Sequence, residues 1–239
     1  KTLYALKINS DPEDTTGAKL LESAAKLASA TDNKLIQIMK CDLNISNCII
    51  DTVQANKITD LIVGIHHKAN IVDTFLGGTI TALINGTSHQ NLIIYGPKRP
   101  INSVKRLVVT VPQMAELEIG FDLWFDRVKN IASQLSIPIV FYANKTTTEA
   151  LKKQCEIHSS LNVSFRELAS WEDFLIISKD IKHSDTLIVI TARKATMSYN
   201  NLFEKIPYYL NKYFADNNFL LIYPQQTAPD GTDNDIYNP

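Results

Sequence analysis

Residues 60–64 read Asp-Leu-Ile-Val-Gly, a short apolar run that leads into a polar loop and then into a helical pattern. The core of this run, Leu61-Ile62-Val63, recurs 126 residues later as Leu187-Ile188-Val189. Each copy follows an amphipathic helical pattern, and each half closes on a similar strand, Leu-Ile-Ile-Tyr or Leu-Leu-Ile-Tyr. A repeat of this size predicts a duplicated domain, because each unit is long enough to bury its own sheet.

Short β-branched runs alternate with longer helical patterns along the whole chain, which is typical of βαβ units and a parallel sheet. The first half predicts strands over Leu3–Ile8, Leu35–Met39, Asp60–Val63 and Leu92–Tyr95, and helices over Gly17–Thr31, Asn47–Asn56 and Gly77–Asn85. The second half predicts strands over Arg106–Val111, Pro138–Tyr142, Val163–Leu168, Thr186–Ile190 and Phe219–Tyr223, and helices over Gly120–Leu135, Thr147–His158, Trp171–Lys182 and Asn201–Phe214. The first half thus lacks one βα unit, which either lies upstream of residue 1 or has been lost.

The predicted organisation is α/β, with two tandem doubly wound, parallel-sheet domains of the Rossmann type. The first, truncated domain covers residues 1–97, a turn-rich linker covers 98–104, and the second domain covers 105–224. Residues 225–239 are polar and rich in Pro, Gly, Asp and Asn, so we expect a poorly ordered tail.

Composition excludes several classes of function. The 24 Lys and Arg nearly balance the 25 Asp and Glu, so we expect no field that would hold polyanions such as nucleic acid or steer the chain toward an anionic membrane. The longest uncharged stretch, 74–97, is interrupted by glycine and amide side chains that are costly in lipid, so we expect no membrane span. The spacing of Cys41, Cys48 and Cys155 matches no common zinc or redox motif. We expect reduced thiols in a cytosol-facing protein, with a Cys41–Cys48 bridge left open.

One loop has the features of a phosphate site. Residues 64–79 leave a strand and enter a helix, and they include Gly64, Gly77 and Gly78, followed by Thr79. Glycines let backbone N–H groups approach an anion, and a helix N-terminus adds partial positive charge. The alternative is that Gly77 and Gly78 only form a tight helix entry.

Four pieces of the first half carry a family resemblance: Asp60-Leu-Ile-Val-Gly64, Lys68-Ala-Asn70, Leu76-Gly77 and Leu92-Ile-Ile-Tyr95. Together they resemble the last βαβ unit of universal stress proteins. In ATP-binding members of that family the motif is Gly, two residues, Gly, nine residues, Gly, then Ser or Thr. Gly64 and Gly77 occupy the first and third glycine positions, and His67 replaces the second. Gly78 stands where the hydroxyl residue belongs, with Thr79 one place later. The resemblance implies ATP or AMP as the candidate ligand of these five residues.

The matching loop of the second half, residues 191–199, contains no glycine. It therefore cannot form the same backbone cradle. Its Arg193, Lys194, Thr196 and Ser198 side chains could still hold an anion, but we favour the interpretation of a solvated basic loop.

The second half carries a narrower resemblance. It rests on Lys105-Arg-Leu-Val-Val-Thr-Val-Pro112, Ala115-Glu-Leu-Glu-Ile-Gly120-Phe, Trp124-Phe125, the loop Thr191-Ala-Arg-Lys-Ala-Thr-Met-Ser-Tyr199 and Phe203-Glu-Lys-Ile-Pro207. These segments are similar to the cytosolic tails of bacterial monovalent cation:proton antiporters, which contain tandem universal stress protein-like domains. The resemblance implies a regulatory domain of a sodium/proton antiporter at the cytoplasmic face of the inner membrane. Its partner would be the membrane domain of the same polypeptide, and as a fragment the tail would be soluble.

The alternative function is a free-standing tandem universal stress protein that binds ATP or hydrolyses it weakly. We expect no catalysis, because hydrolysis needs a metal held by carboxylate or hydroxyl ligands, and Asp73 is the only acid in the 64–79 loop. We expect no metal site, since the adjacent His66 and His67 point apart on an extended loop and no third ligand is obvious. A homodimer is left open.

Overall fold

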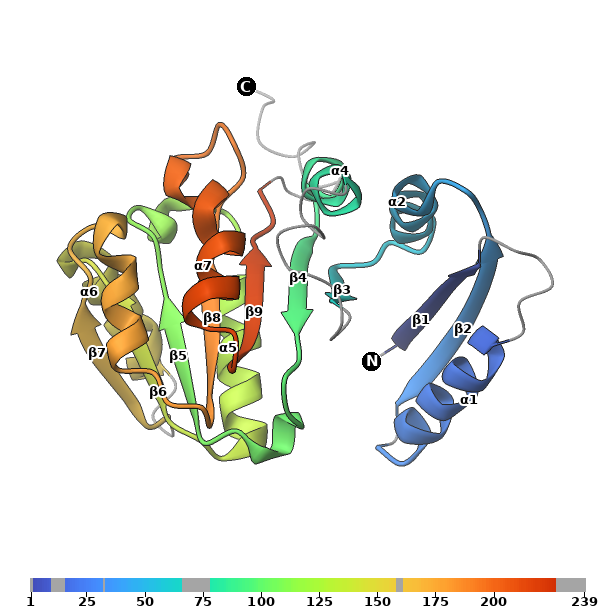
Figure 1. Ribbon diagram of the computed structural model, residues 1–239, viewed down its shortest axis with the longest axis horizontal. Helices are drawn as coiled ribbons and strands as arrows, with labels where there is room; N and C mark the ends of the chain where they lie inside the picture. The colour runs from blue at the N-terminus through green and yellow to red at the C-terminus, as the bar shows by residue number, and fades with distance from the viewer. Residues whose placement is uncertain (1, 10–15, 32, 66–77, 158–160, 227–239) are drawn as a thin grey trace, which may run out of the picture. The chain divides into compact units, whose positions relative to one another are not determined.

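The computed structural model describes residues 2–9, 16–31, 33–65, 78–157 and 161–226 (Figure 1). The chain divides into two compact units, Lys1–Lys57 and Ile58–Pro239. The division falls inside the first domain expected from the sequence, 1–97, so elements of the first half are shared between the units. The boundaries of two equivalent domains stay a prediction, as does the duplication itself.

The smaller unit is a two-stranded parallel sheet with two helices. Strands β1 (Thr2–Asn9) and β2 (Lys34–Cys41) pair in register from Thr2 opposite Lys34 to Asn9 opposite Cys41. Helix α1 (Thr16–Ser29) connects them and contacts both strands. Helix α2 (Ile45–Ala55) follows, and the Asn44 side chain caps it by accepting a hydrogen bond from the Asn47 backbone N–H (3.1 Å).

The larger unit is built on a seven-stranded sheet in the order β3-β4-β9-β8-β5-β6-β7 (Figure 1). Its strands are β3 (Asp60–Gly64), β4 (Asn91–Gly96), β5 (Arg106–Thr110), β6 (Ile139–Ala143), β7 (Val163–Glu167), β8 (Asp185–Ile190) and β9 (Asn218–Tyr223). Its helices are α4 (Thr79–Gly86), α5 (Phe121–Leu135), α6 (Lys145–Ile157) and α7 (Ile206–Tyr213), with the 3-10 segments η1 (Ile101–Ser103), η2 (Ala115–Leu117), η3 (Trp171–Lys179) and η4 (Asn201–Lys205).

Strands β5 to β9 form the doubly wound arrangement that the sequence predicts. The chain runs outward in one direction from β5 through β6 to β7, then returns to β8 on the other side of β5 and continues to β9. All neighbouring strands in this part are parallel. The direction of winding therefore changes between β5 and β8, and in open α/β sheets ligands bind outside the carboxyl ends of the two strands at such a point.

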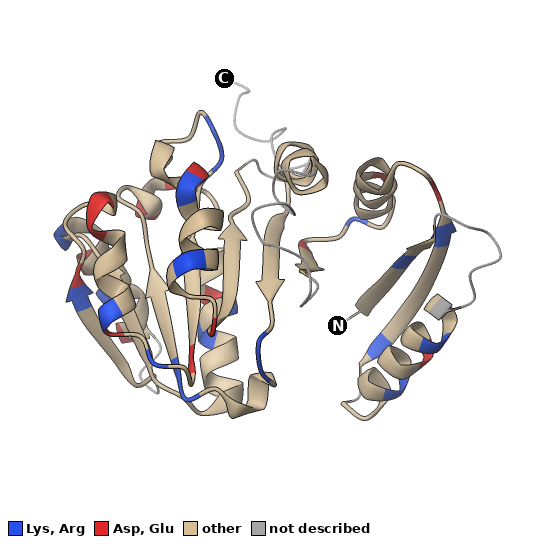
Figure 2. Cartoon of the chain, in the orientation of Figure 1, with Lys and Arg blue, Asp and Glu red and all other residues tan. Residues whose placement is uncertain are grey.

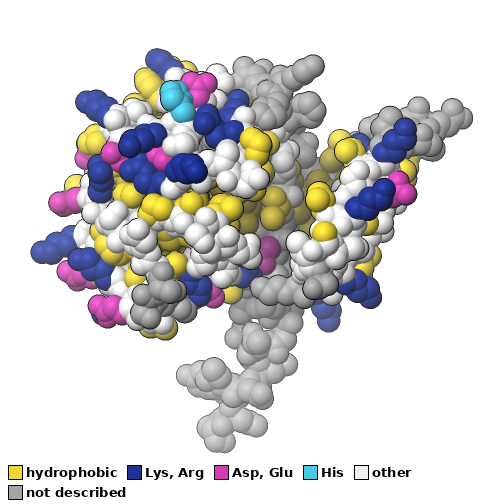
Figure 3. Space-filling model, turned by 90° about the horizontal axis from the view of Figure 1, so that it is seen from below, with side chains coloured by type: hydrophobic (Ala, Val, Ile, Leu, Met, Phe, Trp, Pro, Cys, Tyr) yellow, Lys and Arg dark blue, Asp and Glu magenta, His cyan; other side chains and the backbone are white. Residues whose placement is uncertain are grey.

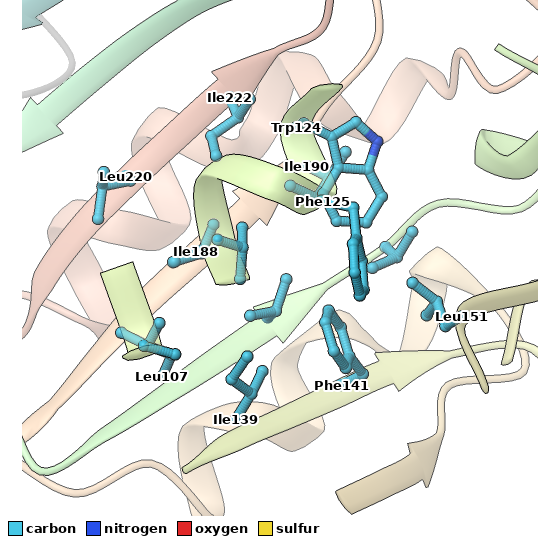
Figure 4. Close-up of a cluster of buried hydrophobic side chains, with 14 of the residues drawn as sticks. Leu107, Trp124, Phe125, Ile139, Phe141, Leu151, Ile188, Ile190, Leu220 and Ile222 are labelled. Atoms are coloured by element: carbon cyan, nitrogen blue, oxygen red, sulfur yellow. The ribbon is translucent and has the colours of Figure 1, made fainter. Parts of the chain in front are cut away.

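The core of the larger unit lies between α5 and the sheet (Figure 4). Trp124 and Phe125 of α5 are 0% and 1% exposed, and the Phe125 ring stacks on Phe141 of β6 at 6.1 Å between centroids. Strands β8 and β9 are buried along their whole length. Burial on both faces explains their almost continuous apolar sequences, because a strand between two layers has no solvent side.

The segment expected to be a helix over Trp171–Lys182 is the 3-10 helix η3. Its buried side chains Trp171, Phe174 and Ile177 are spaced three residues apart, which matches the three residues per turn of a 3-10 helix. Ser170 caps the segment by accepting a hydrogen bond from the Glu172 backbone N–H (3.2 Å). The expected α-helix is thus wrong in type, although its start is correct.

The helix expected over Asn201–Phe214 is divided into η4 and α7. Pro207 lies in the first turn of α7, where its missing N–H breaks no helical hydrogen bond. Farther inside a single continuous helix the same proline would remove one. Asn200 caps η4 by accepting a hydrogen bond from the Leu202 backbone N–H (2.9 Å).

The β4–β9 pair is antiparallel and joins strands of the two halves. It runs from Leu92 opposite Tyr223 to Gly96 opposite Phe219. Gln225, which the sequence assigns to the polar tail, extends the contact between β4 and the chain that follows β9. It is buried, and its backbone N–H donates to the Asn91 side-chain oxygen (3.0 Å). The remainder of the expected tail, 227–239, lies outside the described residues.

Asp60 connects the edge strand β3 to α5. Its two carboxylate oxygens accept hydrogen bonds from Arg127 at 2.8 Å each. Thr59 and Asn91 donate further hydrogen bonds at 2.8 and 3.1 Å. Burial by itself raises the pKa of Asp60, but these hydrogen bonds and the charge of Arg127 outweigh it, so the net pKa lies below the usual value.

We expect the larger unit to lose stability in acid, and Asp60→Asn to weaken this dependence. A carboxyl group with a lowered folded-state pKa contributes stability above its unfolded pKa, near 4, and loses it as the pH falls through the folded value. Urea unfolding at about pH 7 and about pH 3 measures the effect. Asp126→Asn, which removes a more exposed carboxylate paired with Lys129, is the control. The same pH dependence in the wild type and in Asp60→Asn would contradict the assignment.

Candidate functional site

The structure describes three of the five residues expected to form a phosphate site. Gly64 is the last residue of β3 and lies opposite Tyr95 of β4. Gly78 is the N-cap of α4, and Thr79 is the first residue of that helix. His67 and Gly77 lie outside the described residues. The site therefore stays a prediction, with its two ends placed at the end of β3 and the start of α4.

Gly78 has a backbone conformation that requires glycine. Its φ is 79° and its ψ is −31°, in the region that L side chains rarely adopt. It makes no side-chain cap of α4, so the first backbone N–H groups of the helix have no capping side chain at that position. This geometry suits both interpretations of the sequence, a phosphate-binding turn and a tight helix entry.

Gly64, by contrast, is not required by packing. Among the described residues, no atom lies within 4 Å of the position that an added Cβ would occupy, and its φ is not positive. Gly64 is also exposed. Its substitution by alanine should leave the fold unchanged. Gly64→Ala is therefore a suitable control for substitutions of glycines that packing or backbone conformation does require.

Arg193, the first basic residue of the loop after β8, is buried rather than solvated. It is 5% exposed. Its Nη1 donates to the carbonyl oxygens of Pro224 (3.0 Å) and Ser88 (3.4 Å), and its Nη2 donates to Thr87 Oγ1 (3.3 Å) and the Gln90 carbonyl oxygen (3.4 Å). The interpretation of a solvated basic loop is therefore wrong for this residue, because its side chain fastens the turn after α4 to the end of β9.

The charge of Arg193 persists despite its burial. Burial lowers its pKa to about 10, against an opposing effect of Tyr223, and at neutral pH the guanidinium remains protonated. Its partners are carbonyl and hydroxyl oxygens, including those of the turn that ends α4. A cation at a helix C-terminus is stabilised by the helix dipole and by the unpaired carbonyl groups there.

The other side chains that could hold an anion in this loop also have partners within the protein. Lys194 Nζ pairs with Glu204 at 2.9 Å, and Thr196 Oγ1 donates to the Arg193 carbonyl oxygen at 2.9 Å. The backbone N–H and the hydroxyl of Ser198 both donate to one oxygen of Glu118, each at 2.9 Å. The Glu118 carboxylate thus receives the hydrogen bonds that a bound anion would need.

Groups of the protein also close the crevice between the carboxyl ends of β5 and β8. The Glu118–Ser198 contact joins the loop after β5 to the loop after β8. Gly120 lies so close to the chain after β9 that an added Cβ would be 2.5 Å from the Gln225 carbonyl oxygen. Glu116, Glu118 and Asp122 make this edge acidic, which disfavours phosphate. In the second half, the Ser198 donors at the usual ligand position of the fold are therefore already bound to a carboxylate.

Other kinds of site find little support in the part of the chain that the structure describes. No three His, Cys, Asp or Glu side chains come together there as metal ligands. An open groove of about 410 Å³ in the smaller unit is lined by Ala18, Lys19, Leu21, Glu22, Gln37 and Met39. The three cysteines are free in this structure. Among the described helices, every one is too short or too polar to cross a bilayer.

Comparisons with known proteins identify the fold. No family model matches the sequence, and no curated protein does. The cytoplasmic domain of a prokaryotic cation chloride cotransporter matches with a TM-score of 0.64 and 11% identity, covering 94% of this chain and 85% of its own. A universal stress protein from Archaeoglobus fulgidus DSM 4304 matches at 0.56 and 11%, covering 94% and 86%. A protein from Pseudomonas aeruginosa UCBPP-PA14 assigned to the same class matches at 0.59 and 12%, covering 94% and 83%. This chain therefore has a universal stress protein-like, Rossmann-type α/β fold.

Proposed function

We propose that this chain is a non-catalytic cytosolic regulatory domain of a bacterial sodium/proton antiporter. The observation that carries the proposal is the likeness in fold to the cytoplasmic domain of a cation chloride cotransporter over 94% of the chain. The resemblance of residues 105–224 to antiporter tails supports a cation:proton exchanger as the specific class. The partner is then the membrane domain of the same polypeptide, at the cytoplasmic face of the inner membrane.

The closed crevice of the second half supports a regulatory role over a catalytic one. A nucleotide hydrolase needs a water and a metal placed beside the phosphates. In the second half the donors of the loop after β8 are already bound to Glu118, Glu204 and the turn after α4. A regulatory domain needs no reactive group, because it acts by contacting one conformation of its transporter more favourably than another. We therefore expect no ATP turnover above background in the presence of magnesium.

Adenine nucleotide binding is proposed for the first half alone, at Gly64, His67, Gly77, Gly78 and Thr79. We expect Gly77→Val to abolish ATP binding, because the phosphates would approach the backbone N–H groups at the start of α4 and a branched side chain would block that approach. Isothermal titration with ATP measures the affinity, and Gly64→Ala tests whether the first glycine position is also needed. Unchanged affinity in Gly77→Val would place the ligand elsewhere.

The transporter assignment has its own test, independent of nucleotide. About a dozen apolar stretches of ~20 residues encoded upstream of this chain would identify the membrane domain. In that full-length protein, deletion of this domain should change the ion or pH dependence of sodium/proton exchange in inverted membrane vesicles. An upstream sequence with only one short βα unit would instead favour the alternative, a free-standing universal stress protein.

A further inference from the structure

Basic side chains of the larger unit gather at the amino-terminal ends of β5 and β8. Three connections meet there: the chain between β4 and β5, the turn before β8 and the turn before β9. Figure 2 shows Lys and Arg along this lower edge, and Figure 3 views the same face directly and shows them close together. We define the amino-edge patch as Lys98, Arg99, Lys105 and Lys182.

Backbone hydrogen bonds fix the four residues on one surface. The Lys105 backbone N–H donates to the Ser184 carbonyl oxygen at 2.9 Å, which joins the first connection to the second. The backbone N–H groups of Lys98 and Arg99 donate to the Asn218 side-chain oxygen at 2.6 and 2.9 Å. The neighbouring Asn217 donates from its side chain to the Lys182 carbonyl oxygen at 2.7 Å. The fold therefore holds the backbone of these four residues at one edge of the sheet.

The carboxylates at this edge do not neutralise the patch. Asp185 is paired with Arg106, and Asp180 with both Arg106 and Arg166. Asp216 lies 3.9 Å from the imidazole of His183, which carries a charge only when protonated, so the Asp216 carboxylate offsets one of the four positive charges. Within the part of the chain that the structure describes, none of the four patch residues forms an ion pair with a carboxylate. The patch thus keeps a net positive charge although the chain as a whole carries −1.

Apolar side chains accompany these charges. Ile101 is 41% exposed and lies in η1, between Arg99 and Lys105. Tyr213 is 40% exposed at the end of α7, and the Lys212 ammonium lies 5.2 Å from the centre of its ring. Lysines beside an exposed aliphatic side chain and an exposed tyrosine are the composition of protein surfaces that lie at a membrane interface.

We propose that the amino-edge patch binds an anionic lipid surface. Each Lys or Arg close to an anionic leaflet strengthens binding about 5-fold, the equivalent of ~1 kcal/mol. Four such residues give several hundred-fold, which is weak for a free protein but effective for a domain held near a bilayer by a covalent connection. The binding itself does not depend on the antiporter assignment; only the covalent connection does.

Co-sedimentation of the full chain with vesicles tests the proposal. We expect binding to phosphatidylcholine vesicles in which about a third of the lipid is phosphatidylserine, weakening as salt screens the charges, and no binding to phosphatidylcholine alone. The triple variant K98E/K105E/K182E should lose at least about 100-fold in partitioning. The matched control is K145E/K152E/K153E, which reverses three exposed lysines of α6 and should keep the binding.

Three results would overturn the proposal. The first is equal binding to neutral vesicles, and the second is an equal loss in the control variant. The third is duplex DNA that competes as well as anionic vesicles do, which would indicate a general site for polyanions. Circular dichroism of both variants confirms that a loss of binding is not a loss of fold. Failure here would leave the transporter role standing, because that role is tested by ion exchange.

Discussion

Replacing Arg193 by methionine is expected to lower the free energy of unfolding of the larger unit by about 3 kcal/mol. Methionine keeps part of the buried volume but donates no hydrogen bond. The carbonyl oxygens of Pro224, Ser88 and Gln90 would then lose the charged donor of a buried side chain. Hydrogen bonds to charged groups contribute about 1.5–3 kcal/mol, so the loss of several outweighs the gain from removing a buried charge.

Lys194→Met is the matched control for this prediction. The two residues are adjacent and both are cationic, but Lys194 is exposed and pairs with Glu204 on the surface, so its loss should leave the stability nearly unchanged. Urea unfolding at neutral pH measures both variants. Arg193→Lys should recover little of the loss, because a single ammonium group cannot reach all the acceptors of a guanidinium. Equal midpoints for Arg193→Met and Lys194→Met would show that Arg193 is not the fastening side chain.

The regular elements of this fold can be predicted from the sequence because each is indicated by residues that are close together in the chain. The strands β5, β8 and β9 are continuous apolar runs, and the helix α5 has the period of a helix with one buried face. The same reasoning missed the 3-10 form of η3, although the three-residue spacing of Trp171, Phe174 and Ile177 was visible. Over nine residues, a period of three and a period of 3.6 give nearly the same pattern of buried positions. The sequence pattern therefore does not distinguish a 3-10 helix from an α-helix here.

The role of Arg193 could not be predicted from its neighbours in the sequence. Its partners belong to the turn after α4 and to the end of β9, which are 103–106 and 31 residues away. One signal was available: only two small residues, Thr191 and Ala192, separate Arg193 from the apolar run Leu187–Ile190. An arginine this close to a buried strand can lie in the interior only if its guanidinium is paired, as it is here.

Net charge also concealed the arrangement of charges. A balance of 24 cations and 25 anions predicted no field that would draw the chain to a polyanion or an anionic membrane, but that prediction considered only the chain as a whole. Parallel strands, however, bring all their amino-terminal connections to one edge and all their carboxyl-terminal loops to the other. Basic connections such as 97–106 and acidic loops such as 113–122 are therefore sorted to opposite ends by topology. Composition cannot show this separation, because it contains no topology.

Of the candidate nucleotide site, the sequence placed Gly78 at a helix entry, and the structure shows it as the N-cap of α4 with a positive φ. The sequence could not distinguish a ligand-binding turn from a helix entry, because both use the same backbone conformation. For the second half, the absence of glycine from residues 191–199 predicts a loop without the same backbone cradle, and this stays a prediction. That Glu118 would take the place of an anion there depends on a contact between residues 80 apart in the chain.

Gly96→Ala is expected to destabilise the larger unit by about 2 kcal/mol. Gly96 lies opposite Phe219 in the antiparallel β4–β9 pair, and an added Cβ would overlap the Phe219 ring. Phe219 is 1% exposed, so the ring cannot move out into solvent. Alanine in a strand is otherwise favoured over glycine by about 0.5–1 kcal/mol. The steric cost of overpacking in a core, about 1–3 kcal/mol or more, should exceed this gain.

A second substitution distinguishes this clash from a general loss of strand stability. Phe219→Leu removes ring atoms that an added Cβ at position 96 would meet, so Gly96→Ala should cost at least about 1 kcal/mol less in the Phe219→Leu background than in the wild type. Gly64→Ala is the control, because no described atom lies within 4 Å of a Cβ added at that position. It should change the free energy of unfolding by less than about 0.5 kcal/mol. Urea unfolding of the wild type, the three single variants and the double variant gives the coupling energy directly. Additive effects of the two substitutions would mean that the ring does not rest on Gly96, and the close approach of the two halves at this seam would then be incorrect.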